Sequence, residues 1–187
     1  MFERELIIGG QKSGKSRRGE LNAAAWLAAS PSHDAMLIAT AQPWDDEMRE
    51  RIARHQEDRA QRVPGLRTVE EPLALAEAVA AHSAPQTMVL VDCLTLWLTN
   101  RLMPMPGAQA PTESPAQAID ALLAALANAR GPVVLVGNEI GLGVIPMGRE
   151  VRAFVDALGQ LNQSVAATCD RVTLMVAGLP LTLKEPA

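Results

Sequence analysis

The amino-acid sequence predicts a single α/β domain in which a mostly parallel β-sheet carries helices on both faces. Short apolar runs alternate with segments of helical pattern along all 187 residues. Runs that are apolar throughout are typical of parallel strands buried on both faces. A glycine-rich motif directly follows the first run. With 48% hydrophobic residues, the chain is long enough for one sizeable core, so residues 1–187 are expected to form one domain.

Each expected strand is a short run of apolar or β-branched residues between polar segments. In chain order these runs are 5–8, 35–40, 67–69, 87–91, 133–136, 171–177 and 181–184. The run at 87–91 is almost purely apolar and ends in Asp92, and the run at 133–136 leads into a polar, glycine-rich turn.

Each expected helix has apolar residues at helical spacing between a capping residue or proline and a breaker. In chain order these segments are 16–29, 45–61, 72–82, 94–102, 115–129 and 149–168. Acidic residues open the helix at 45–61, where they suit the positive end of a helix, and Pro72 is expected in the first turn of the next helix. The segment 103–115 is rich in proline, glycine and alanine and is the best candidate for a mobile or variable loop.

The glycine-rich motif is a Walker A loop. Residues 9–16 read Gly-Gly-Gln-Lys-Ser-Gly-Lys-Ser, which satisfies G-x-x-x-x-G-K-[ST] between a strand and a helix. Gly9 and Gly14 allow the backbone to curl around a phosphate chain. Lys15 would reach the β- and γ-phosphates, and Ser16 would hold Mg²⁺. The motif predicts a P-loop NTPase fold of the RecA-like kind.

Two further segments are expected at the same edge of the sheet. Asp92 ends an apolar strand, which is where a Walker B residue holds Mg²⁺; alternatively, it caps the next helix. The turn 137–146 is either a shaped ligand loop or an ordinary connection. The guanine-reading Asn-Lys-x-Asp motif of switch GTPases is absent, which argues against a regulatory GTPase.

His55 is the candidate nucleophile. Helical spacing places it on one face with Met48, Ile52 and Arg59. A neutral imidazole could attack phosphorus there, and neighbouring arginines would stabilise the developing charge. From this residue alone, a packed or solvated histidine is the alternative.

Composition excludes several classes of partner. The net charge of −4, the pI near 5.4 and the absence of a basic run argue against a nucleic-acid partner. Cys93 and Cys169 lack disulfide or zinc-ligand spacing and are interpreted as core residues in a reducing compartment. No apolar stretch is long enough to span a bilayer, and a soluble, cytoplasmic protein is expected.

Together these motifs resemble the bifunctional adenosylcobinamide kinase/adenosylcobinamide-phosphate guanylyltransferase family. The matching set, in order, is Gly-Gly-x-x-Ser-Gly-Lys-Ser-Arg-x-x-Glu at 9–20, Ala39-Thr40, Asp45-Asp46-Glu47-Met48, Arg51-Ile52-x-x-His55-x-x-x-Arg59, Thr68-x-Glu70, Asp92, Thr99-Asn100, Asn138-Glu139-x-Gly141-x-Gly143-x-x-Pro146 and Leu161-Asn162-Gln163. The chain departs from the family at Leu66, near a frequent tryptophan, and at Gly19, a usual alanine. The segment 103–115 has no motif that aligns.

The resemblance implies an enzyme of cobalamin nucleotide-loop assembly. It would phosphorylate the aminopropanol hydroxyl of adenosylcobinamide and then attach GMP from GTP to that phosphate, releasing pyrophosphate. His55 would carry GMP covalently, Lys15 would be the second catalytic residue, and Ser16 and Asp92 would hold Mg²⁺. The implied nucleotide-binding residues are Gly9, Gly10, Gln11, Lys12, Ser13, Gly14, Lys15, Ser16, Thr40, Ala41, Gln42, Gln56, Glu57, Asp58, Arg59, Glu70 and Asp92.

ATP and GTP are the expected nucleotide substrates, and the resemblance suggests a homotrimer. Two alternatives remain from the sequence. One is a single-activity small-molecule kinase in which His55 is structural. The other is a nucleotide-dependent ATPase or binding module that uses the loop as a conformational switch.

Overall fold

The computed structural model describes residues 4–105, 107 and 112–186. Strands and helices alternate along most of the chain, as the sequence predicts. In chain order the elements are β1 (Arg4–Gly9), α1 (Lys15–Ala29), β2 (Asp34–Ala39), α2 (Asp46–Arg62), β3 (Leu66–Glu70), α3 (Leu75–His82), β4 (Thr87–Asp92), α4 (Leu94–Leu102), α5 (Pro115–Ala127), β5 (Val133–Asn138), α6 (Arg149–Thr168), β6 (Arg171–Val176) and β7 (Leu179–Lys184).

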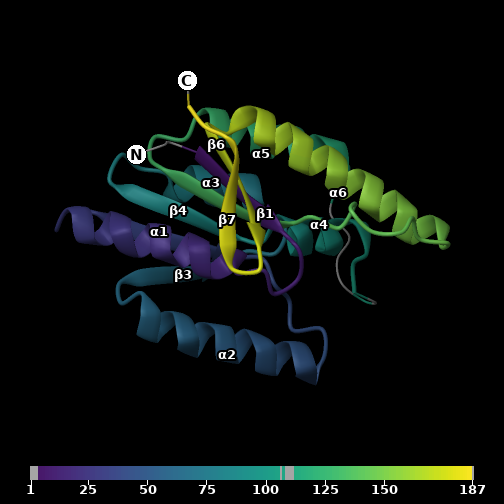
Figure 1. Ribbon diagram of the computed structural model, residues 1–187, viewed down its shortest axis with the longest axis horizontal. Coiled ribbons are helices and arrows are strands. Elements are labelled where there is room, and N and C mark those ends of the chain that lie inside the picture. Colours follow the sequence, from purple (N-terminus) through teal and green to yellow (C-terminus); the bar gives the residue numbers. More distant parts are fainter. Residues whose placement is uncertain (1–3, 106, 108–111, 187) are drawn as a thin grey trace.

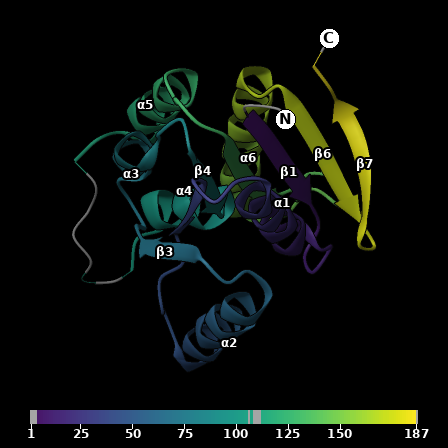
Figure 2. The same cartoon turned by 90° about the vertical axis from the view of Figure 1, so that its left-hand side faces the viewer.

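The strands form one sheet in the order β3-β2-β4-β5-β1-β6-β7. Every pairing among β1 to β6 is parallel, and only β7 runs antiparallel, beside β6. Helices α3 to α6 cover one face and α1 covers the other, while α2 lies further out, beyond α1 and β3 (Figures 1 and 2). The predicted α/β class, with a mostly parallel sheet and helices on both faces, is confirmed.

The core has two layers because successive side chains of a strand point to opposite faces. In β5, Val133 and Leu135 pack in the layer of α3 to α6, whereas Val134 and Val136 pack in the layer of α1. Burial on both faces explains why these strands are continuously apolar in sequence.

One predicted helix start is wrong. The helix expected from residue 72 begins at Leu75, because the Glu71 carboxylate accepts hydrogen bonds from the backbone amides of Leu73 (2.9 Å) and Ala74 (2.7 Å). This turn satisfies amides that a first helical turn would leave free, so Pro72 lies before the helix.

The loop expected at 103–115 joins α4 to α5. Ser114 caps α5 through a capping box with Gln117, which explains the sharp helix start at Pro115. Residues 106 and 108–111 of this loop lie outside the described residues, so its expected mobility or variability stays a prediction.

Cys93 and Cys169 are buried and free, as expected of core residues. Burial is the main cause that raises the pKa of each thiol to about 12, with a smaller contribution from Asp92 at Cys93 and from Asp170 at Cys169. Within the described ranges, each helix is too short or too polar to cross a membrane.

Candidate active site

The carboxyl ends of the parallel strands gather the predicted site residues along one edge of the sheet. Ala39 of β2 is in register with Glu70 of β3 on one side and with Asp92 of β4 on the other. Further along, Asn138 of β5 lies beside Gly9 of β1. Open α/β sheets bind their ligands at this edge.

Two glycines allow the Walker A loop to form between β1 and α1. Gly9 has φ 154°, and a Cβ there would lie 2.4 Å from the Met175 carbonyl oxygen, so only glycine fits. Gly14 adopts the left-handed conformation (φ 98°) at the N-cap of α1. The loop therefore delivers its backbone amides to the N-terminus of α1, where anions bind favourably.

The turn between β6 and β7 supports this loop from the side. The Gly178 amide donates a 3.0 Å hydrogen bond to the Ser13 carbonyl, and the turn lies beside the start of α1 (Figure 1). Sequence reasoning missed this contact. The glycine between two apolar runs indicates a hairpin turn, but nothing local to it locates the Walker loop as its neighbour.

Lys15 is buried within the loop. Its Nζ donates to the Gly10 carbonyl (2.6 Å) and to Ser13 Oγ (3.4 Å). Burial lowers the pKa of Lys15, and the nearby Cys93 and Asp92 groups oppose that shift. The ammonium group thus has neutral oxygens as its hydrogen-bond partners among the described residues, and a bound phosphate would supply the missing countercharge.

Ser16 and Asp92 meet across the gap between α1 and β4. Ser16 Oγ donates to Asp92 Oδ1 at 3.4 Å. The N-cap of α4 is Cys93, without a side-chain capping bond, so Asp92 does not serve as the cap of that helix. The pair has the arrangement in which P-loop enzymes hold Mg²⁺.

Thr40 fixes the backbone next to Asp92. Its Oγ1 donates to the Cys93 carbonyl (2.7 Å) and accepts from the Cys93 amide (2.9 Å), and the side chain is fully buried. Both hydrogen-bonding roles of the hydroxyl are therefore engaged with the backbone of the residue that follows Asp92. Ala41 and Gln42 follow in the loop before α2, where Gln42 Oε1 accepts from Trp44 Nε1 at 3.3 Å.

His55 is exposed on α2, and its side chain has no hydrogen bond or ion pair to the rest of the described chain. The structure therefore brings the Walker residues together but leaves His55 outside that cluster. Glu57 is also exposed. Figure 2 shows α2 as the outermost helix on the α1 side of the sheet.

The second half of α2 is anchored to the core by polar contacts. Buried Glu20 of α1 pairs with Arg62 (2.6 Å) and more distantly with Arg59 (3.8 Å). Gln56 donates to Glu70 at 3.2 Å, so two predicted nucleotide-binding residues lie together. Asp58 pairs with Arg62 one turn along the helix.

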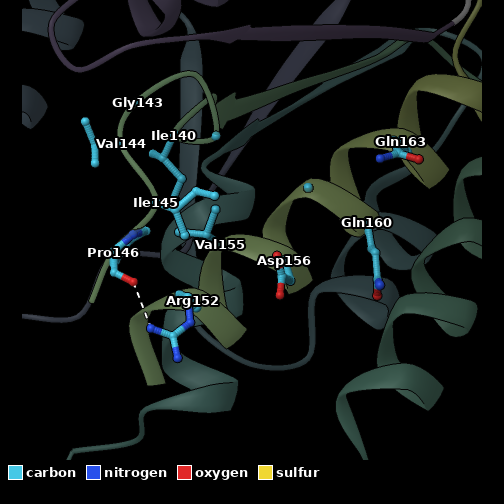
Figure 3. Close-up of a pocket in the computed structure, with 12 residues that line it drawn as sticks. Ile140, Gly143, Val144, Ile145, Pro146, Arg152, Val155, Asp156, Gln160 and Gln163 are labelled. Atoms are coloured by element: carbon cyan, nitrogen blue, oxygen red, sulfur yellow. Dashed lines mark hydrogen bonds between the residues drawn. The ribbon is translucent and has the colours of Figure 1, made fainter. Parts of the chain in front are cut away.

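A groove lies between the loop 140–146 and α6 (Figure 3). Its volume is about 510 Å³, and Arg152 in its lining donates to the Pro146 carbonyl at 2.9 Å. Val144 in its lining and the neighbouring Met147 are each 96% exposed. Sequence reasoning marked this segment as a possible ligand loop but assigned no residue in it.

Fold and site together define a P-loop nucleotide-binding protein of RecA-like architecture. The decisive features are the Walker A loop, the buried Lys15 and the Ser16–Asp92 pair at the carboxyl edge of a parallel sheet.

The comparisons narrow this class to one family. The family model described as cobinamide kinase / cobinamide phosphate guanyltransferase matches residues 5–183. The chain is 47% identical over 184 residues to the bifunctional adenosylcobalamin biosynthesis protein CobP of Pseudomonas aeruginosa, covering 98% of this chain and 99% of that protein. It is 37% identical to the protein CobU of Escherichia coli, covering 96% and 98% respectively. The chain therefore belongs to the cobinamide kinase / cobinamide phosphate guanyltransferase family.

A solved structure supports the fold alone. The flagellar accessory protein FlaH of Methanocaldococcus jannaschii aligns with a TM-score of 0.56 at 11% identity, covering 98% of this chain and 79% of that one.

By family, the protein is a kinase and nucleotidyltransferase of cobalamin biosynthesis. Both activities belong to the family description, which disfavours the single-activity kinase and the nucleotide switch.

Proposed function

We propose that one Walker site serves two successive reactions on a cobinamide substrate. In the first, the aminopropanol hydroxyl of adenosylcobinamide attacks the γ-phosphate of a nucleoside triphosphate, ATP or GTP. In the second, GMP from GTP is joined to the new phosphate and pyrophosphate leaves. The observation that carries the proposal is the buried Lys15 beside the Ser16–Asp92 pair, in a chain that belongs to this family over nearly its whole length.

The Walker loop holds the triphosphate in both reactions. Backbone amides of residues 9–16 and the α1 N-terminus face the phosphates, and Lys15 exchanges its Gly10 and Ser13 contacts for phosphate oxygens. Ser16 and Asp92 are the residues that would hold Mg²⁺. Their oxygens fit a hard cation that takes few protein ligands and completes its shell with phosphates and water, and Mg²⁺ would neutralise charge between the β- and γ-phosphates.

His55 is the nucleophile proposed for guanylyl transfer. One imidazole nitrogen forms a bond to the α-phosphorus, and the bond from that phosphorus to the α–β bridging oxygen breaks, so pyrophosphate leaves with the electron pair. The cobinamide phosphate then takes the GMP from His55. The exposure of the ring supports this role, because it is open to a substrate as large as a corrinoid phosphate.

The proposed nucleotide residues outside the Walker loop that the site has not yet accounted for fall into three groups. Gln56 and Glu70 form one polar pair near His55, and Ala41 and Gln42 lie in the loop that leads into α2. We assign the base and ribose of GTP to this region, because it flanks the Walker edge at the carboxyl ends of β2 and β3. Glu57, Asp58 and Arg59 form the third group, on α2, where the ion pair of Arg59 with Glu20 also helps to hold the helix.

A homotrimer in the cytoplasm completes the proposal. Exposed apolar side chains on the loop 140–147 and on β7 support self-association, among them Leu142 (83% exposed), Val144 and Leu179 (71%). Large exposed apolar patches mark interaction sites. The free, buried cysteines are consistent with a reducing compartment. Sedimentation equilibrium should give three times the mass of the 19.9 kDa chain; a monomer at micromolar concentration would contradict the trimer.

Product analysis tests the proposed function. The enzyme, adenosylcobinamide, ATP, GTP and Mg²⁺ should give first the phosphate and then the GDP derivative of the corrinoid, with one pyrophosphate for each GDP derivative. Omitting GTP but not ATP should stop the reaction at the phosphate if ATP serves the kinase step. Absence of both products would refute the proposal.

A further inference from the structure

The end of β5 is held in place more firmly than an ordinary loop start. The Asn138 amide donates to Thr95 Oγ1 of α4 (2.8 Å), and its carbonyl accepts from Asn162 Nδ2 of α6 (3.1 Å). The next amide, that of Glu139, donates to the Gly9 carbonyl at 3.0 Å. Thr95 and Asn162 are buried, so three elements fix this backbone beside the first glycine of the Walker loop.

The side chain of Asn138 points to the α1 side of the sheet. Val134 and Val136 belong to the α1 layer, and Gly137 faces Asn162 and Leu94 on the other side. Alternation along the strand then places Asn138 on the α1 face. Its neighbour in register is Gly9, whose ideal Cβ would lie 2.8 Å from Ser13 Oγ. Asn138 thus faces the space beneath the Walker loop.

This position lies between the two halves of the phosphate site. In the sheet order, β5 separates β1, which leads into the Walker loop, from β4, which carries Asp92. Adjacent strands are about 4.8 Å apart, and Asp92 is in register with Val136, two residues before Asn138. The γ-phosphate lies between the Walker lysine and the Mg²⁺-binding residues in P-loop enzymes, so it would lie above the end of β5.

The Asn138 carboxamide is available for a ligand. It is half-buried, and it makes no hydrogen bond to another residue in the described part of the chain. The adjacent Glu139 is different, because its Oε1 already accepts from the Gly141 amide at 2.7 Å and shapes the turn. The structure therefore fixes the Asn138 backbone from three directions while leaving its side chain unpartnered.

We propose that Asn138 is a catalytic residue of the kinase step that donates a hydrogen bond from its side-chain amide to a γ-phosphate oxygen. This inference rests on the proposed use of the Walker site. In that step the substrate hydroxyl oxygen bonds to the γ-phosphorus, the bond to the β–γ bridging oxygen breaks, and the nucleoside diphosphate leaves with the electron pair. The hydroxyl proton passes to solvent. Asn138 stabilises charge on the oxygens of the phosphoryl group in transfer.

Guanylyl transfer should depend much less on this residue. There the bond that breaks lies between the α-phosphorus and the α–β bridging oxygen, and the γ-phosphate leaves unchanged within pyrophosphate. A hydrogen bond to the γ-phosphate is then about equal in the ground and transition states, and such uniform binding does not raise kcat.

The test compares Asn138→Ala and Asn138→Asp with Asn128→Ala. Asn128 is an exposed asparagine at the end of α5 whose side chain, among the described residues, bonds only to the Ala124 carbonyl (2.8 Å), and it serves as the matched control. Asn138→Ala should lower kinase kcat about 100-fold, with label transfer from the α-phosphate of GTP onto the enzyme changed less than fivefold. Asn138→Asp should be at least as impaired, because it places a carboxylate against the γ-phosphate, although it matches asparagine in shape. Asn128→Ala should match the wild type.

A binding readout separates contact with the γ-phosphate from a structural role. The wild type should prefer a nonhydrolysable GTP analogue over GDP, and Asn138→Ala should reduce that ratio of Kd values about tenfold. Kinase activity within threefold of the wild type, or an equal loss of both activities, would overturn the inference. If Lys15→Ala instead retained both activities, the Walker assignment itself would fail, so the two failures are distinguishable.

Discussion

The Walker edge and helix α2 are built in contrasting ways. At the Walker edge, the side chains of Lys15 and Thr40 donate to backbone carbonyls, and the backbone of Asn138 is bonded to buried side chains of α4 and α6. On α2, the buried Glu20 contacts hold the second half of the helix, while His55 remains exposed. The phosphate-binding part is preformed, whereas the proposed nucleophile stands on a helix attached mainly through side-chain charges.

The two reactions make different demands on the Walker edge and on α2. Phosphoryl transfer needs positioning and charge neutralisation at the γ-phosphate, which the rigid edge can supply. Guanylyl transfer also needs a side chain delivered to the α-phosphate. Damage to the Walker edge should therefore stop both reactions, and damage to α2 should affect guanylyl transfer more than the kinase step.

Lys15→Ala should have the largest effect. Losing one preorganised charge donor to a phosphate site costs about 100- to 1,000-fold in kcat, and both reactions need the triphosphate in the same loop. Separate kinase and guanylylation assays measure it. If the folded variant keeps either activity within a few-fold, the two reactions do not share the Walker site.

Glu20→Gln should loosen α2 without touching the Walker loop. Removing the carboxylate leaves Arg59, with only 9% of its side chain exposed, without its charge partner, and breaking a buried ion pair costs about 3–5 kcal/mol. Chemical denaturation should show this loss, and label transfer to the enzyme should fall more than kinase activity.

The control is Arg49→Ala, which removes an exposed ion pair with Asp46 on the same helix. It should change the free energy of unfolding by less than about 0.5 kcal/mol. If Glu20→Gln lowered the free energy of unfolding by no more than Arg49→Ala does, α2 would not depend on the buried ion pair.

Asp92→Asn should shift the Mg²⁺ dependence of both reactions to concentrations about tenfold higher. An amide oxygen is a poorer ligand for a hard cation than a carboxylate. Because Thr40 bonds the Cys93 backbone, the fold should be retained. An unchanged Mg²⁺ titration would remove Asp92 from the metal site.

Lys15→Met should stabilise the nucleotide-free protein while abolishing activity. Burial lowers the pKa of Lys15, so its protonated form destabilises the folded state at neutral pH. This cost falls as pH rises between the lowered pKa and the ordinary value of 10.5. Removing a buried charge that is kept for function should raise the free energy of unfolding by about 1 kcal/mol. Thermal unfolding at pH 7 should show a higher Tm for the variant, by a margin that shrinks toward pH 10; a lower Tm would contradict the assigned cost.

Local sequence patterns predicted the residues of the Walker edge well, but they did not predict the hydrogen bonds from distant segments that hold this edge in place. The Walker motif fixes its own conformation through Gly9 and Gly14, and Asp92 follows from its place at the end of an apolar strand. The contacts that hold this edge join residues far apart in sequence. Gly178 bonds Ser13, and the Asn138 backbone bonds the side chains of Thr95 and Asn162. Such pairings depend on strand order, which no local motif encodes.

Helix α2 was predicted in part: its position in the sequence was predicted, but the burial of Arg59 was not. Helical spacing predicted the helix, but it placed His55 and Arg59 on one face without distinguishing which of them would be buried. Arg59 is buried because Glu20 of α1 offers a charge partner, and only the tertiary structure reveals that neighbour.

If His55 and the Walker loop act together on one GTP, a covalent guanylyl-enzyme must form, and labelling with GTP detects it. Wild-type enzyme incubated with Mg²⁺ and GTP labelled at the α-phosphate, without a corrinoid, should acquire one label per chain and release pyrophosphate. The bond should be a phosphoramidate, labile in acid and stable in base, and peptide mapping should locate it at His55. His55→Ala should acquire no label yet keep kinase activity within a few-fold, and Lys15→Ala should lose both. Label on the His55→Ala protein, or none on the wild type, would show that His55 is not the nucleophile.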